Sequence, residues 1–155
     1  MGDEAGGPAQ IDAGVDLEKA EGDGGTALCV AVAEGHEALG WALLEAGADV
    51  NMAADDGSTP LFIAAQEGHE VVVLALIERV AYINKAEDDG RTPLYIGAQN
   101  GHKAVVRALM QADADVNKAR DGGATPLSAS SQPVSNVARG NHAAIVQRLW
   151  DAGAV

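Results

Sequence analysis

Aromatic residues, cysteine and basic residues are all scarce in this 155-residue chain. Phe, Trp and Tyr make up 3% of the sequence, so a core must be built from Ala, Val, Leu and Ile packed closely, as in stacked helices. The one cysteine, Cys29, cannot form an internal disulfide bond, which suits a reducing compartment. Lys and Arg number 10 against 23 Asp and Glu, and the net charge of −13 disfavours nucleic acid and anionic membrane surfaces as partners.

Long apolar runs are also missing. The longest aliphatic stretch, around residues 71–77, is too short to span a bilayer. The chain does not open on a charged segment followed by an apolar one, and Gly6 stands where a myristoylation motif needs Ser or Thr. We therefore expect an intracellular protein, cytoplasmic or nuclear.

A repeat of constant length is the main feature that the sequence does contain. Thr26, Thr59, Thr92 and Thr125 are each 33 residues apart, and each opens a similar segment. A constant period of this size predicts a stack of small units, none of which can bury its own apolar face. We place the units at about 21–53, 54–86, 87–119 and 120–155, after a disordered tail over residues 1–12. One repeat domain over residues 13–155 is the expected organisation.

Each unit carries the signals of two helices. The repeated Thr can cap the first helix, and Pro60, Pro93 and Pro126 occupy the first helical position, where a missing N–H costs nothing. A glycine then ends this helix, because glycine tolerates the left-handed conformation there. The second helix has apolar pairs four residues apart, which gives it one apolar face. These pairs are Leu39 with Leu43-Leu44, Val72-Val73 with Leu76-Ile77, Val105-Val106 with Leu109-Met110, and Ile145-Val146 with Leu149-Trp150.

This pattern resembles the ankyrin repeat, whose signature is a turn followed by Thr-Pro-Leu-His, paired Ala, Gly-His and a Val-Val…Leu-Leu helix. The third unit illustrates it with Thr92-Pro93-Leu94, Gly97-Ala98, Gly101-His102 and Val105-Val106. The resemblance covers about residues 13–155 and implies an all-α repeat, an ankyrin-type α-solenoid of paired antiparallel helices joined by β-hairpin-like turns.

Several positions depart from the family pattern. Val80 and Asp113 occupy the slot of Gly47, so we expect strain at Val80 if the backbone there is left-handed. Gly40 stands where the later units have valine, which weakens the second helix of unit one. Unit four carries seven extra residues between about 130 and 137. This insert is either an exposed bulge without a role or a loop that contacts a partner.

No residue pattern indicates catalysis or metal binding. His36, His69 and His102 recur at the repeat period, and stacked helices lie about 8–10 Å apart, too far for these nitrogens to reach one zinc ion. We expect them to hold the turn between the two helices of a unit. The Asp-rich turns lack the alternate spacing and the later Glu of a calcium loop. We therefore predict no enzyme activity, no cofactor and no metal.

A surface is the remaining candidate for function. In ankyrin-like stacks the turn tips and the exposed side of the first helices form one concave face, where partners usually bind. An acidic ridge beside two aromatic rings could anchor a basic or amphipathic segment, with the rings supplying burial. Acidic tips could equally serve only as good turn residues that keep the chain soluble. The candidate residues are Asp55, Asp56, Phe62, Gln66, Glu67, Asp88, Asp89, Arg91, Tyr95, Gln99 and Asp121.

The sequence thus predicts a protein–protein interaction module that works as a monomer. The partner is expected to be another protein, not nucleic acid or a membrane. Two alternatives stay open. The chain could be a regulatory repeat segment detached from a larger enzyme or channel, or a purely structural spacer.

Overall fold

The computed structural model describes residues 16–20, 22, 24–131 and 139–155. The expected tail at 1–12 and residues 132–137 of the insert lie outside the described residues. Eight α-helices and no β-strand occur in the described part. They are α1 (Ala27–Ala33), α2 (Glu37–Glu45), α3 (Pro60–Glu67), α4 (Glu70–Glu78), α5 (Pro93–Gln99), α6 (Lys103–Gln111), α7 (Pro126–Ser130) and α8 (Arg139–Asp151).

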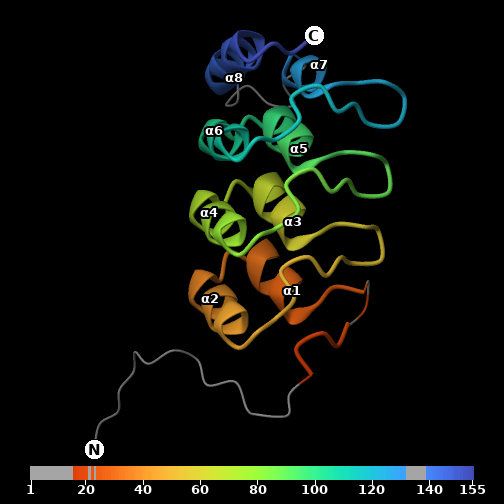
Figure 1. Cartoon of the computed structure of the whole chain (residues 1–155), viewed down its shortest axis with the longest axis vertical. Helices are drawn as coiled ribbons and strands as arrows, with labels where there is room; N and C mark the ends of the chain where they lie inside the picture. Colours follow the sequence, from red (N-terminus) through yellow and green to blue (C-terminus); the bar gives the residue numbers. More distant parts are fainter. Residues whose placement is uncertain (1–15, 21, 23, 132–138) are drawn as a thin grey trace, which may run out of the picture.

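The helices stand in two parallel columns along the long axis of the molecule (Figure 1). The first helix of each unit, α1, α3, α5 or α7, belongs to one column, and the second helix belongs to the other. The loops between units project to one side, beyond the column of first helices (Figure 1). This arrangement confirms the all-α repeat fold that the 33-residue period predicts.

The first helices begin where the threonines predict. The Oγ1 atoms of Thr26, Thr59, Thr92 and Thr125 accept hydrogen bonds from the backbone N–H three residues later, at 3.1–3.3 Å. Each bond satisfies one of the N–H groups that a helix start leaves without a partner. Gly35, Gly68 and Gly101 follow these helices with φ between 73° and 78°, the left-handed conformation expected of them.

The core is a single apolar cluster that extends through all four units. Its most buried side chains include Leu28, Leu61, Leu94, Leu109 and Leu149, each at most 1% exposed. Because neighbouring units share this cluster, each unit depends on the next for its burial. Gly40 interrupts the pattern in α2, and a Cβ atom built there would meet no other atom within 4 Å.

The backbone at Val80 and Asp113 is left-handed, as the alignment with Gly47 predicts. Their φ angles are 65° and 64°. Aspartate tolerates this conformation better than a β-branched residue does, so the strain is concentrated at Val80.

Replacing Val80 with glycine should raise the free energy of unfolding by about 0.5 kcal/mol, because relief of about 1–2 kcal/mol of strain exceeds the entropic cost of glycine. The Val80 side chain is 76% exposed, so little packing is lost with it. Urea denaturation of the two proteins measures the difference. A clearly less stable Gly variant would show that the valine is not strained.

Helix α8 is longer than the other second helices. In units one to three the histidine after the glycine, such as His102, is the residue that precedes the helix. In unit four Asn141 replaces that glycine, and α8 already begins at Arg139. His142 therefore lies inside the helix and is 3% exposed. Without a left-handed glycine to stop it, the helix extends toward its N-terminus.

Candidate functional site

The loops between units are hairpin-like turns that end in a tight tip. The backbone N–H of Glu87 donates to the carbonyl of Arg91 at 3.0 Å, and that of Gly90 donates to the carbonyl of Glu87 at 2.9 Å. The same pairs of bonds close the tips around Gly57 and Gly123. The tip glycine of each turn has a positive φ, which only glycine adopts without strain.

Neighbouring tips are joined to one another by backbone hydrogen bonds. The N–H of Asp88 donates to the carbonyl of Asp56, and the N–H of Asp121 donates to that of Asp89, both at 2.9 Å. The next unit also covers the tip glycine. A Cβ atom added at Gly90 would lie 2.8 Å from the backbone nitrogen of Asp121. The three tips therefore form one continuous edge.

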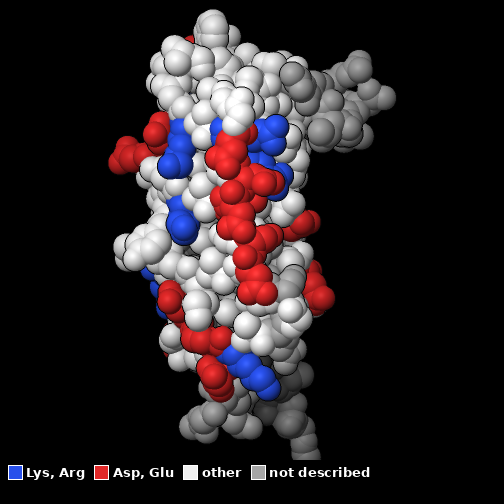
Figure 2. All heavy atoms as spheres, turned by 90° about the vertical axis from the view of Figure 1, so that its right-hand side faces the viewer, with Lys and Arg blue, Asp and Glu red and all other residues white. Residues whose placement is uncertain are grey.

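Five exposed aspartates line this edge. We call them the acidic ridge, and they are Asp55, Asp56, Asp88, Asp89 and Asp121. Figure 2, which faces the tips, shows a column of acidic side chains along the middle of the stack. The Oδ1 atom of Asp56 accepts the N–H of Ser58 at 2.9 Å, so that carboxylate also shapes its turn. The structure thus brings the predicted aspartates together on one side of the molecule.

Glu87 and Arg91 form an ion pair at the base of the third tip. Arg91 donates from Nε to Glu87 Oε1 at 3.1 Å, and its own backbone N–H reaches the same oxygen at 3.0 Å. The Glu87 side chain is only 4% exposed, so it belongs to the packed turn and not to the acidic ridge. Arg91 also lies over the ring of Phe62, 5.8 Å from its centroid. The four-residue spacing of these two opposite charges was a sequence signal for the ion pair, which was not predicted.

Burial by itself raises the pKa of Glu87, but the hydrogen bonds from the Arg91 side chain and from the backbone N–H groups of Arg91 and Asp89 outweigh it. The pKa of Glu87 is therefore lowered from its ordinary value of 4.5. The bond to Glu87 in turn raises the pKa of Arg91.

Replacing Glu87 with Gln should cost about 1–2 kcal/mol of stability at neutral pH, through the loss of charge-assisted hydrogen bonds. Because the folded-state pKa is lowered, this contribution is complete above the unfolded-state pKa and disappears as pH falls through the folded-state value. Urea denaturation at pH 7 and pH 3 should show the difference between the two proteins shrinking at the lower pH. A difference that stays the same at both pH values would contradict the pairing.

The prediction that Phe62 and Tyr95 lie on the candidate binding surface is wrong. They were expected to be rings that a partner could contact, but they are only 2% and 3% exposed. Both follow a capping Thr near the start of a first helix. Phe62 belongs to the apolar core cluster, and Arg91 lies over its ring. Neither ring can serve as a surface anchor in this structure.

The other candidate residues lie at the ends of α3 and α5. Gln66 and Glu67 are exposed, and Gln99 is half-buried. The carbonyl of Gln66 lies 2.9 Å from His102 Nε2 in the next unit and accepts a hydrogen bond from Asn100 Nδ2 at 3.1 Å. His142 Nε2 lies 2.9 Å from the carbonyl of Gln99 in the same way. His102 and His142 thus connect neighbouring units. The prediction that His102 holds the turn within its own unit missed this contact, whereas His36 does lie 2.9 Å from Glu34 of its own unit.

The described residues offer no cluster of ligands for catalysis on a metal. No group of three or more His, Cys, Asp or Glu side chains within them could hold an ion. Cys29 is buried in α1. Of the helices that the structure describes, none has the length and apolar character needed to cross a membrane.

The comparisons with known proteins agree with this architecture. A family model described as ankyrin repeats in three copies matches residues 9–87 and 41–120, together more than half of the chain. No curated protein matches the sequence. The matched segments end at residue 120. A further pair of helices, α7 and α8, follows that residue. The chain therefore belongs to the ankyrin repeat family.

Proposed function

We propose that this chain binds a basic segment of a partner protein along the acidic ridge. Ankyrin repeats are generally protein-interaction modules. The observation that carries the proposal is the line of exposed aspartates on three tips that hydrogen bonds hold in register. Two cations lie within these tips. Arg91 already pairs with Glu87 and lies 3.7 Å from Asp89, and the exposed Arg120 directly precedes Asp121. Asp55, Asp56, Asp88 and Asp121 form no ion pair with any described residue.

The spacing of the tips suggests how the basic segment is organised. Stacked helices lie about 8–10 Å apart, and the tips share that interval. A polyproline II segment advances about 3.1 Å per residue with three residues per turn, so every third side chain would face a new tip. The preferred segment is therefore a polyproline II one with Lys or Arg at every third position.

Charge has to supply most of the recognition, because Phe62 and Tyr95 are buried and unavailable as anchors. Exposed charges act mainly by steering association, and salt screens them beyond about 8 Å at physiological ionic strength. Binding at the ridge should consequently weaken steeply as salt is added, mainly through a slower association rate.

A synthetic peptide with Lys at every third position provides the test, with association measured by stopped-flow fluorescence at several salt concentrations. Changing Asp88 and Asp89 to Asn keeps the side-chain shape and should slow association by about tenfold, the lower end of electrostatic steering. Glu37→Gln with Glu78→Gln is the matched control, since it removes the same charge from exposed positions on α2 and α4.

Two results would reject the proposal. Binding that changes neither with salt concentration nor with the Asn substitutions would show that the acidic ridge does not contact the peptide. Equal slowing by the ridge variant and the control would mean that only net charge matters. Absence of any binding by this peptide would favour the alternative that the chain is a structural spacer.

A further inference from the structure

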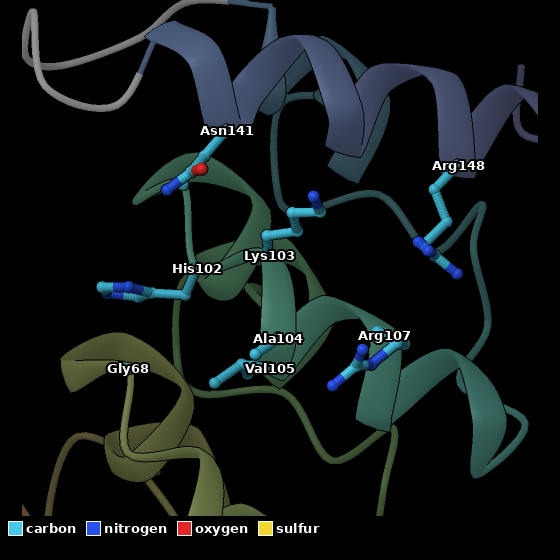
Figure 3. A pocket seen from close by; sticks show the side chains of 9 residues that line it. Gly68, His102, Lys103, Ala104, Val105, Arg107, Asn141 and Arg148 are labelled. Carbon is cyan, nitrogen blue, oxygen red and sulfur yellow. The ribbon is translucent and has the colours of Figure 1, made fainter.

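A basic groove lies between α6 and α8. These helices belong to the column of second helices, and the loops between units project beyond the other column (Figure 1). Its volume is about 360 Å³, and Lys103, Arg107, Asn141 and Arg148 border it (Figure 3). An adjoining hollow of about 520 Å³ shares Lys103 and Arg148 with it. Volumes of this size fall in the range of small-molecule sites, about 300–1,000 Å³.

Unit four departs from the other units at one packed position beside this groove. His142 aligns with His102, so Arg148 occupies the slot of Ala108, Ala75 and Ala42. Those three alanines are 4–7% exposed and let neighbouring helices approach closely. An arginine cannot be packed in the same space, and Arg148 is exposed beside the groove. The change places a positive charge beside the space between α6 and α8.

Two further changes within the repeat make this space positively charged. Lys103 stands where units one and two have Glu37 and Glu70, and Arg107 stands where they have Trp41 and Leu74. As a result, three of the ten Lys and Arg residues in a chain of net charge −13 border one groove. Among the described residues no Asp or Glu lines the 360 Å³ part, and Asp151 lines the adjoining hollow.

These cations are only partly neutralised. Arg107 donates to Glu70 Oε1 at 3.1 Å, but both side chains are substantially exposed, so the pair is weak. Lys103 and Arg148 form no ion pair with any residue in the described ranges. Lys and Arg side chains can only donate hydrogen bonds, and Asn141 adds an amide. Neighbouring positive charges repel each other, and a bound anion would relieve that repulsion.

We propose that this groove binds a small soluble anion that carries phosphate groups. A phosphate group presents several acceptor oxygens and more than one negative charge, which matches a groove bordered by three cations better than a single carboxylate does. The net charge of −13 opposes approach to an anionic membrane, so a free small molecule is favoured over a lipid headgroup. This site is separate from the acidic ridge and would serve a second ligand.

Isothermal titration calorimetry with inorganic tripolyphosphate tests the proposal on the full chain. Saturable binding with one ligand per chain is the expected result. Changing Lys103 to Glu and Arg148 to Ala installs the residues that other units carry in those slots, so the variant should fold. Its affinity should fall by at least about tenfold, since a hydrogen bond to a charged group is lost at each position.

Lys118→Glu with Arg120→Ala is the matched control. It makes the same change in charge at exposed positions outside the groove and should leave the affinity within about twofold. Equal weakening by both pairs of substitutions, or no saturable binding by the unaltered chain, would overturn the site. So would binding to vesicles of anionic phospholipid without binding to tripolyphosphate.

Discussion

Replacement of Tyr95 with alanine should lower the free energy of unfolding by about 3 kcal/mol, the usual cost of removing a large buried aromatic side chain. Tyr95 lies near the start of α5 and is 3% exposed. Helix α5 is in the middle of the stack and contacts both α3 and α7. A cavity at this position would therefore weaken the packing of unit three against both of its neighbours.

Tyr82→Ala is the matched control, because Tyr82 is 63% exposed and should cost less than about 0.5 kcal/mol. Urea denaturation followed by circular dichroism measures both variants. The comparison also separates two roles for Tyr95. A surface anchor would lose partner binding while the fold kept its stability, whereas a buried core residue would lose stability first. Similar stabilities for the two alanine variants would contradict the burial of Tyr95.

Gly90→Ala should also be strongly destabilising, by about 3 kcal/mol, from two separate causes. The φ angle at Gly90 is 82°, and a left-handed alanine costs about 1–2 kcal/mol. The added Cβ would lie 2.7 Å from Asp121 Oδ1 and 2.8 Å from the Asp121 backbone nitrogen. Since that nitrogen donates to the carbonyl of Asp89, the bond between two tips would have to shift, at an overpacking cost of about 1–3 kcal/mol.

Gly123→Ala separates these two causes. Gly123 has a φ angle of 87°, but a Cβ added there would meet no atom within 4 Å. This variant should therefore show only the backbone strain of about 1–2 kcal/mol. The difference between the two alanine variants measures the contact between neighbouring tips. If both lost the same stability by thermal or urea unfolding, the tips would not be packed as the structure shows.

Much of the fold could be predicted from the sequence, because the signals are local. The threonine caps, the prolines at Pro60, Pro93 and Pro126, and the glycines after the first helices act within a few residues of themselves. Their positions fixed where the helices begin and end in the first three units. The left-handed backbone at Val80 also followed from alignment with Gly47, since equivalent residues of a repeat share a backbone conformation.

The candidate surface was less predictable. The aspartates of the ridge lie at the tips as expected, but nothing in the local sequence shows that Phe62 and Tyr95 are buried or that the Glu87 side chain is buried against Arg91. The sequence shows that Asn141 stands where the other units have glycine. That difference alone did not predict that helix α8 would begin at Arg139.

The sequence by itself determined that this chain is a stack of helix pairs with acidic turns, since a repeated local pattern must repeat its local structure. The tertiary structure decided which side chains face the neighbouring unit and which face solvent. It buried the two aromatic rings, joined the tips through backbone hydrogen bonds and placed Lys103, Arg107 and Arg148 at the border of one groove. The physical reason is that a side chain in a repeat protein is buried by the neighbouring unit. The pattern of residues within one unit does not specify that contact.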